Sequence, residues 1–227
     1  MNNHPRRRLL ACATALALVP FIALADAADP ESPSSAQNAA AQALSSGEAE
    51  LKRAAPADGF LGRIARHCGQ AFEGRIVTNE PPQPDDAFAG KRLVMHVRSC
   101  DPQQIKIPFH VGDDHSRTWV LTRLADGLRL KHDHRHEDGS DDAVTMYGGD
   151  TNSTGSELRQ EFPVDAESIA TFEREGLSAS VTNVWAMEIE TGKRFLYELA
   201  RPGGRLFQVE FDLTKPVELP PAPWGHP

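Results

Sequence analysis

From Lys91 onward, apolar side chains recur at every second position, and this period limits the possible folds more than any other feature. In QIKIPFHV, residues 104 to 111, Ile105, Ile107, Phe109 and Val111 share one face, and Lys106, Pro108 and His110 share the other. Successive side chains of a β-strand point to opposite faces, so the alternation predicts a strand with one buried face. Pro108 cannot donate a backbone hydrogen bond, which predicts an edge strand or a bulge there.

Further stretches have the composition of strands, and short turns connect several of them. They are AFEGRIV, KRLVMHVRSC, RTWVLTRL, GLRLKHDH, AVTMYG, SVTNVWAMEIE, KRFLYELAR and RLFQVEFDL. Asp126-Gly127 predicts a two-residue hairpin turn. Thr191-Gly192-Lys193 predicts a three-residue turn, because only that length makes one face of the hairpin wholly apolar. It sets Trp185, Met187 and Ile189 opposite Leu199, Tyr197 and Phe195.

Two short helices accompany these strands. Asp165 can cap the first turn of AESIATFERE, Gly176 can end it, and residues 60 to 67 predict a helix before the first strand. Strands joined by hairpins predict a mainly β fold, an antiparallel up-and-down meander that closes as a barrel of about eight to ten strands. A two-sheet sandwich is the alternative.

The N-terminal segment predicts export. Residues 6 to 8 are arginines, and an apolar run over residues 9 to 24 ends at Ala25-Asp26-Ala27. This pattern is typical of a secretory signal peptide, so residues 1 to 27 are expected to be removed, although cleavage could also follow Ala25. The mature protein would then be periplasmic or secreted, and not integral to the membrane. The adjacent arginines leave the twin-arginine route open.

Composition divides the remaining chain into three parts. Residues 28 to 56 are rich in Ala, Ser and Pro with almost no large apolar side chains, which predicts a disordered linker with at most brief helical structure. Residues 57 to 219 form the predicted β-barrel-like domain, which has the ordinary size of a single domain. Residues 220 to 227 form a Pro-rich tail.

The net charge limits the classes of binding partner, and the cysteine content predicts a disulfide. The formal net charge is −8, and removal of residues 1 to 27 takes away more basic than acidic side chains, so nucleic acid is a poor partner. Cys68 and Cys100 are the cysteines that remain after this removal. Because an exported chain meets oxidising conditions, a disulfide between Cys68 and Cys100 is predicted.

Three histidines alternate within KHDHRHEDGSDD, residues 131 to 142. If the strand runs unbroken from Gly127, these histidines continue its inward, leucine-bearing face. Pairing through the Asp126-Gly127 turn would place His132 opposite Leu121, His134 opposite Trp119 and His136 opposite Arg117. The favoured interpretation is a strand that ends near Lys131 and is followed by a polar surface loop.

This stretch is a candidate metal site. Two imidazoles at positions i and i+2 of a strand can bind one zinc or copper ion, so His132 and His134 are the proposed ligands. His136 lies too far along a straight strand to join them without a bend. A third ligand would come from His96, His110 or a nearby acid.

Residues 150 to 161, DTNSTGSELRQE, resemble a calcium-binding loop. Asp150, Asn152, Thr154 and Glu161 occupy ligand positions, but Thr154 replaces the usual carboxylate or amide and the flanks do not look helical. A glycine-rich surface turn is the stronger interpretation.

Other side chains on predicted inward faces could line a ligand cavity instead of filling a core. They are Trp119, Leu121, Trp185 and Tyr197. The sequence contains no nucleophile elbow, no phosphate-binding glycine loop and no dinucleotide fingerprint, so no catalytic residue is assigned.

The block LRLKHDHRHEDGSDDAVTMYGGDT, with the closing FDLTKPVELPPAPWG, resembles a pattern found in uncharacterised secreted proteins of Gram-negative bacteria. The resemblance covers about the last half of the chain and implies no activity, substrate or catalytic residue. By strand pattern alone, the meander is also similar to the lipocalin and nitrobindin group of ligand-holding barrels, which does not imply a shared function.

The sequence thus predicts an exported, non-catalytic β-domain that binds a small apolar ligand in its interior. Two alternatives remain: a metal-binding protein or metal-dependent hydrolase that uses His132 and His134, and an envelope interaction module with an exposed apolar patch. A ligand binder should have an unfilled apolar interior. A metal enzyme should bring the histidines together with a third ligand around an open position.

Overall fold

A computed structural model describes residues 35–82 and 86–226 of the chain. Residues 41–227 form one compact unit, and the fold below is that of this unit. The predicted signal peptide lies outside the described residues. None of the described helices has the length and apolarity needed to cross a bilayer.

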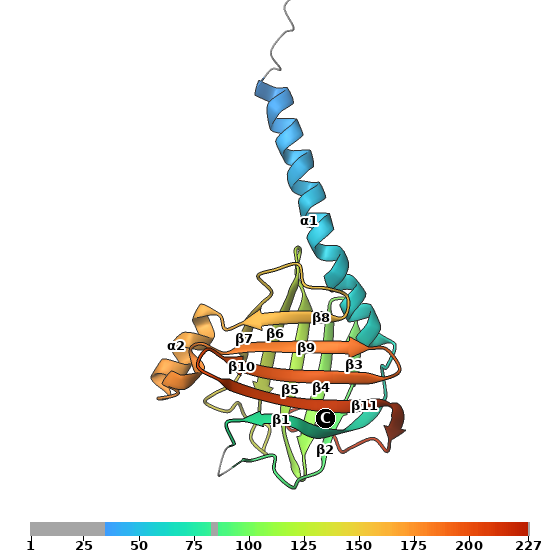
Figure 1. Cartoon of the computed structure of the whole chain (residues 1–227), viewed down its shortest axis with the longest axis vertical. Coiled ribbons are helices and arrows are strands. Elements are labelled where there is room, and N and C mark those ends of the chain that lie inside the picture. Colours follow the sequence, from blue (N-terminus) through green and yellow to red (C-terminus); the bar gives the residue numbers. More distant parts are fainter. Residues whose placement is uncertain (1–34, 83–85, 227) are drawn as a thin grey trace, which may run out of the picture. The chain divides into compact units, whose positions relative to one another are not determined.

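The domain is mainly β, and one antiparallel sheet forms a nearly closed barrel (Figure 1). Its strands are β1 (Ala71–Glu80), β2 (Leu93–His96), β3 (Ser99–Asp101), β4 (Gln104–Val111), β5 (Asp114–Arg123), β6 (Leu128–His134), β7 (Tyr147–Asp150), β8 (Arg159–Pro163), β9 (Val184–Glu190), β10 (Arg194–Arg201) and β11 (Arg205–Val217). The strand order is β7-β6-β5-β4-β2-β1-β11-β10-β9-β8, and β3 pairs with β4 beside this path. The predicted up-and-down meander is therefore confirmed.

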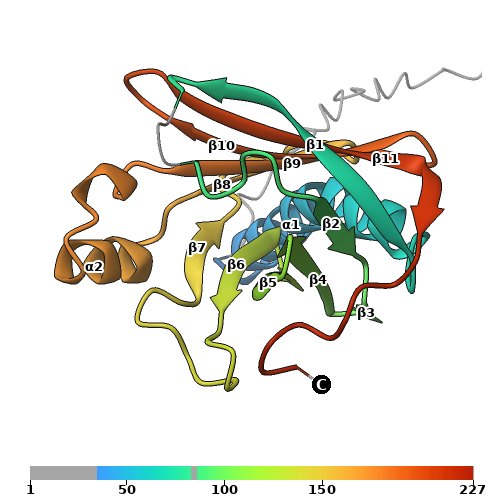
Figure 2. The same cartoon turned by 90° about the horizontal axis from the view of Figure 1, so that it is seen from below.

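Two long-range features decide how the barrel closes. The first strand pairs with the last, β1 with β11, while β7 and β8 leave an unsealed seam. Seen from below, β9, β10 and β11 lie on one side of the interior and β4 to β7 on the other (Figure 2). Pro108 faces β2 and β3 where neither pairs with β4, so its missing N–H removes no ladder hydrogen bond.

The start of helix α2 (Ala166–Arg174) bridges the seam. Asp165 caps this helix as predicted, accepting a hydrogen bond from the Ser168 N–H. The Ser168 hydroxyl accepts from the Gly148 N–H at 2.8 Å and donates to the Gly148 carbonyl at 3.2 Å. Gly149 has no room for a side chain, because a Cβ there would lie 1.7 Å from the Pro163 carbonyl oxygen. Small residues thus let β7 lie against the segment that follows β8.

The hairpin registers test the two predicted turns. The turn at residues 191–193 is confirmed, since Ile189 pairs with Phe195, Met187 with Tyr197 and Trp185 with Leu199.

The Asp126-Gly127 turn was predicted wrongly. Leu124 and Gly127 close a hairpin whose central residues are 125 and 126, so Trp119 lies opposite His132 and Arg117 opposite His134. Gly127 is required for another reason: a Cβ there would meet the Thr151 hydroxyl at 2.2 Å. The shift is two residues, an even number, so the histidines keep the predicted inward face.

Helix α1 (Ser35–Ala65) replaces most of the predicted linker. The structure is helical over residues 35 to 56, where the sequence analysis expects disorder, because alanine-rich sequence favours helix even without a buried face. The C-terminal part of α1 buries Ala57, Phe60 and Ile64 in the barrel core. The helix predicted over residues 60 to 67 is the end of α1. Beyond it, Cys68 and Cys100 form the predicted disulfide, with Cα atoms 6.2 Å apart.

The C-terminal segment after β11 has no regular structure through residue 226. The Trp224 N–H donates to the His115 carbonyl at 3.0 Å, and His226 Nε2 lies 2.8 Å from a carboxylate oxygen of Asp133. The predicted tail therefore packs against the outer face of β5 and β6, where it helps bury Asp133.

Candidate functional site

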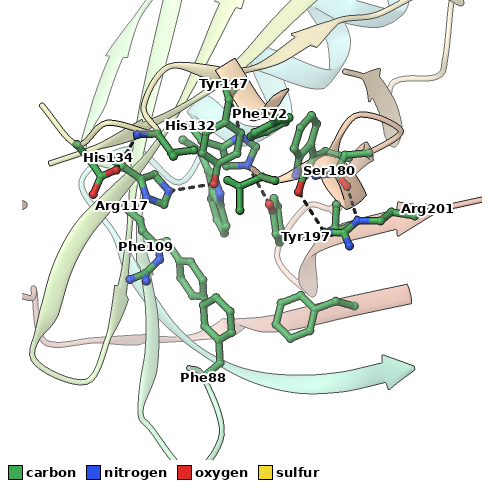
Figure 3. Close-up of a pocket in the computed structure, with 18 of the residues that line it drawn as sticks. Phe88, Phe109, Arg117, His132, His134, Tyr147, Phe172, Ser180, Tyr197 and Arg201 are labelled. Carbon is green, nitrogen blue, oxygen red and sulfur yellow. Dashed lines mark hydrogen bonds between the residues drawn. The ribbon is translucent and has the colours of Figure 1, made fainter. Parts of the chain in front are cut away.

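A cavity of about 370 Å³ occupies one end of the barrel interior (Figure 3). Eight aromatic side chains line it: Phe88, Phe109, Trp119, Tyr147, Phe172, Trp185, Tyr197 and Phe207. Among the polar lining residues, Arg117, Asp142, Arg201 and Arg205 are partly exposed and mark its solvent side, here called the rim. The volume lies within the range of about 300 to 1,000 Å³ that is typical of small-molecule sites.

The aromatic wall is held by ring contacts that continue from β4 to β10. Trp119 stacks on Tyr197 at 4.5 Å between ring centroids and on Phe109 at 4.9 Å. His132 stacks on Tyr147 at 4.7 Å with nearly parallel planes. Each ring rests against another, so the cavity wall is rigid and largely preformed.

His132 is a neutral imidazole with both nitrogens in use. Its Nδ1 lies 3.1 Å from the Tyr147 carbonyl oxygen, which can only accept, so Nδ1 carries the proton and donates. Nε2 therefore accepts from the Tyr197 hydroxyl, which lies 2.8 Å away. Burial, followed by the proximity of His134, lowers the pKa of His132 to about 3. Burial likewise holds the pKa of Tyr197 well above its usual value, so its hydroxyl stays a donor.

His134 and Tyr147 form a second hydrogen-bonded pair, with 3.1 Å between His134 Nε2 and the Tyr147 hydroxyl (Figure 3). Burial, followed by the nearby Arg117 guanidinium, lowers the pKa of His134 to about 4. Burial raises the pKa of Tyr147 to about 12. At neutral pH these side chains offer the cavity hydrogen-bonding groups without net charge.

The charges are confined to the rim. Arg117 pairs with Asp114 and lies over the Phe88 ring, 5.5 Å from its centroid. Arg201 and Arg205 stand on the opposite wall, on β10 and β11, and their described side-chain partners are neutral. The cavity thus has an uncharged interior and a cationic rim.

Three of the four predicted cavity residues line the cavity: Trp119, Trp185 and Tyr197. Leu121 does not. It is one inward position further from the rim than Trp119 and is fully buried in the packed core. His132 and His134 also line the cavity, because β6 continues to His134; the favoured prediction that the strand ends near Lys131 was wrong.

The structure does not assemble the predicted metal ligands. His136 lies beyond β6 and is exposed. His96 and His110 are on the outer face of the barrel, since His110 lies opposite Val94 while Phe109 faces the cavity. Among the described residues, no group of three or more His, Cys, Asp or Glu side chains is arranged to hold a metal ion. The zinc or copper hypothesis gains no support from this geometry.

The calcium-loop residues do not converge either. Asp150 is on β7 and accepts two hydrogen bonds from the Arg129 guanidinium, at 2.6 and 2.8 Å. Glu161 is on β8 and pairs with Arg159 at 2.9 Å. Thr154 is exposed and Asn152 lies in the same surface loop. Both carboxylates are thus occupied by arginines on separate strands.

Sequence reasoning missed the arginines of the rim, although a signal was present. Leu199 and Arg201 have the same parity on β10, and Arg205 and Phe207 have the same parity on β11. The two-residue period that placed His132 and His134 inward therefore also placed both arginines inward. Phe88 and Phe172 could not have been found this way, because they lie outside the strands.

The fold and the site define a class: an antiparallel β-barrel with a preformed, ring-lined internal cavity of ligand size. No protein-family model, no curated protein and no solved structure matches this chain. Its function must therefore be argued from the cavity itself.

Proposed function

We propose that this protein is a non-catalytic binding protein that holds a small, mainly apolar ligand in the barrel cavity, in the periplasm or outside the cell. One observation carries the proposal: about 370 Å³ of space is walled by aromatic rings. A domain that used these rings only for stability would have packed them together, because empty volume costs contact energy.

The polar groups suit a binding role better than a catalytic one. His132 and His134 are both kept neutral, and both His132 nitrogens are bound to the protein, so this imidazole has no free lone pair for a proton or a metal. Such groups can orient a ligand by hydrogen bonds while the rings supply most of the contact area. The Cys68–Cys100 disulfide is compatible with an oxidising compartment.

Binding of N-phenyl-1-naphthylamine, a neutral aromatic probe that fluoresces in apolar surroundings, tests the proposal. We expect saturable binding of one equivalent by the mature protein. Leu199→Trp, which fills space at a lining position, should weaken binding at least tenfold. Val77→Trp adds the same side chain at an exposed position of β1 and is the matched control. Absence of saturable binding to the unmodified protein, or equal binding by Leu199→Trp, would refute the proposal.

A further inference from the structure

Resting on the proposed function, we infer that the natural ligand is an amphiphile with a carboxylate group. Arg201 and Arg205 bind the carboxylate at the rim, and the apolar body of the ligand extends inward along the ring-lined wall.

The two arginines are a directly opposed pair. Arg201 on β10 lies opposite Arg205 on β11, and both belong to the face that lines the cavity. Like charges at opposed positions of neighbouring strands destabilise a sheet. Selection for stability alone would therefore disfavour Arg201 and Arg205 at opposed positions. An anion bound between the two guanidinium groups would remove the repulsion.

Both guanidinium groups have only neutral protein acceptors among the described residues. Arg201 Nε donates to the Asn183 amide oxygen at 2.5 Å, and its Nη2 lies 3.4 Å from the Ser180 hydroxyl. Arg205 Nη1 donates to the Asn79 amide oxygen at 2.6 Å and to the Pro81 carbonyl at 3.2 Å. Over residues 35–82 and 86–226, neither side chain forms an ion pair with a carboxylate.

Other arginines of this chain are paired with carboxylates. Arg117, on the facing wall of the same cavity, pairs with Asp114. Arg159 is bound by three glutamates, and Arg129 is held by Asp150 through two hydrogen bonds. In a chain with a net charge of −8, carboxylates are abundant, yet no described carboxylate pairs directly with Arg201 or Arg205, and Asp86 reaches Arg205 only through the Asn79 amide.

The electrostatics at Arg201 reflect the proximity of the second arginine. Burial, followed by the proximity of Arg205, lowers the pKa of Arg201 from its ordinary value, although the group stays charged at neutral pH. Asp142 is the one carboxylate among the described lining residues, and its electrostatic influence falls on His134 and Tyr147. The planar fork of a guanidinium matches the two oxygens of a carboxylate, which makes this head group the natural counterion.

Calorimetric titration of the mature protein with matched acid and alcohol pairs tests the inference. Octanoate against octanol represents a chain-like ligand body, and 2-naphthoate against 2-naphthol represents a planar one. We expect each acid to bind about 10- to 100-fold more tightly than its alcohol, the factor expected for charge-assisted hydrogen bonds. The pair with the tighter acid identifies the ligand body.

Substitutions then assign the preference to the two arginines. Arg201→Gln and Arg205→Gln should each weaken acid binding at least tenfold while changing alcohol binding less than twofold. Arg201→Lys keeps the charge and should retain part of the preference. Arg75→Gln removes an exposed guanidinium on β1, away from the cavity lining, and is the matched control. Thermal unfolding of each variant checks that the fold is intact, and added salt should weaken acid binding by the unmodified protein more than alcohol binding.

The outcomes separate this inference from the proposed function. If the neutral naphthylamine probe binds but the acids show no advantage, the cavity is a binding site and the carboxylate inference is wrong. The same conclusion follows if Arg201→Gln and Arg205→Gln weaken acid and alcohol equally. If neither the neutral probe nor any acid binds, both the proposed function and the inference are overturned.

Discussion

The interior of this barrel has two ends, and the same strands build both. At the end near α1 the inward positions are apolar and fully packed, with Leu121 and Leu130 opposite each other and Phe195 opposite Phe211. At the other end, the inward positions are occupied first by side chains with rings and then, nearest the rim, by polar or charged ones. Along β5 they run Leu121, Trp119, Arg117; along β6, Leu130, His132, His134; along β10, Phe195, Tyr197, Leu199, Arg201; and along β11, Phe211, Val209, Phe207, Arg205.

The two-residue alternation of inward side chains therefore builds a packed core at one end of the barrel and a cavity wall at the other. The alternation that puts a residue inward is the same along the whole strand, but the residue type sets whether the inward position fills space or borders a cavity. Stability should therefore depend mainly on the packed end, and ligand binding mainly on the cavity end.

The largest effect is expected when acid protonates the buried histidines of the cavity end. The pKa of His132 is lowered to about 3 in the folded protein, whereas the unfolded chain takes up this proton near pH 6.5. The contribution of His132 to stability is thus complete above pH 6.5 and falls by about 1.4 kcal/mol per pH unit as the pH drops toward 3, and His134 adds a contribution of the same sign. Urea unfolding between pH 7 and pH 4 measures this slope.

Two substitutions test whether His132 causes the dependence of the free energy of unfolding on pH. His132→Gln should make stability less dependent on pH by about that amount, because no proton is then excluded from the site. His136→Gln replaces an exposed histidine outside the barrel interior and is the matched control. An unchanged slope in His132→Gln would show that another group governs acid unfolding.

The next largest effect on stability is expected from a leucine-to-alanine substitution, whose cost should differ between the packed end and the cavity end of the barrel. Leu121→Ala, at the packed end, should lower the free energy of unfolding by about 2 to 5 kcal/mol, because it leaves a void among fully buried side chains. Leu199→Ala, at the cavity end, borders space that already exists and should cost less than about 1.5 kcal/mol. Equal costs in urea unfolding would contradict the division into a packed and an open end.

Features of the fold that depend on neighbouring residues could be predicted from the sequence, whereas features that depend on contacts between distant segments could not. Most of the strands, their inward faces and the turn at residues 191–193 follow from local alternation and are confirmed. The strand predicted over AVTMYG, residues 143 to 148, was misplaced, since β7 begins only at Tyr147. The turn at residues 124–127 was misplaced because Gly127 is needed for the close approach of Thr151, a contact 24 positions along the chain. The short strand β8 was missed inside a segment that resembled a calcium loop.

The cavity itself was beyond sequence reasoning. Alternation placed Trp119 and Leu121 on the same face, yet only one of them borders the cavity. Which inward positions meet empty space depends on the pairing of β1 with β11 and on the ring contacts across the barrel, none of which leaves a local pattern. The inward arginines were predictable in principle by the parity that identified the histidines.

A smaller effect tests the hydrogen bonds within the cavity wall. Tyr197→Phe removes the donor to His132 Nε2 and leaves a buried acceptor unpaired, so it should lower stability by about 1 to 3 kcal/mol. Tyr147→Phe should cost less, because its partner His134 is more exposed and can bind water instead. Thermal and urea unfolding of both variants measure the difference. A larger loss in Tyr147→Phe would indicate that His134, not His132, is the critical imidazole of the wall.

The smallest effect on stability is expected where the inferred effect on binding is large. Arg201→Gln loses a hydrogen bond to Asn183 but also removes a repulsion from Arg205, so the free energy of unfolding should change by less than about 1 kcal/mol. Leu121→Ala is the reverse case, with a large loss of stability and little change in the affinity of the folded barrel. Urea unfolding and acid titration of both variants give four measurements. If Arg201→Gln lost several kcal/mol of stability, the arginine would be part of the packed structure, and the contrast between the two ends of the barrel would fail at its rim.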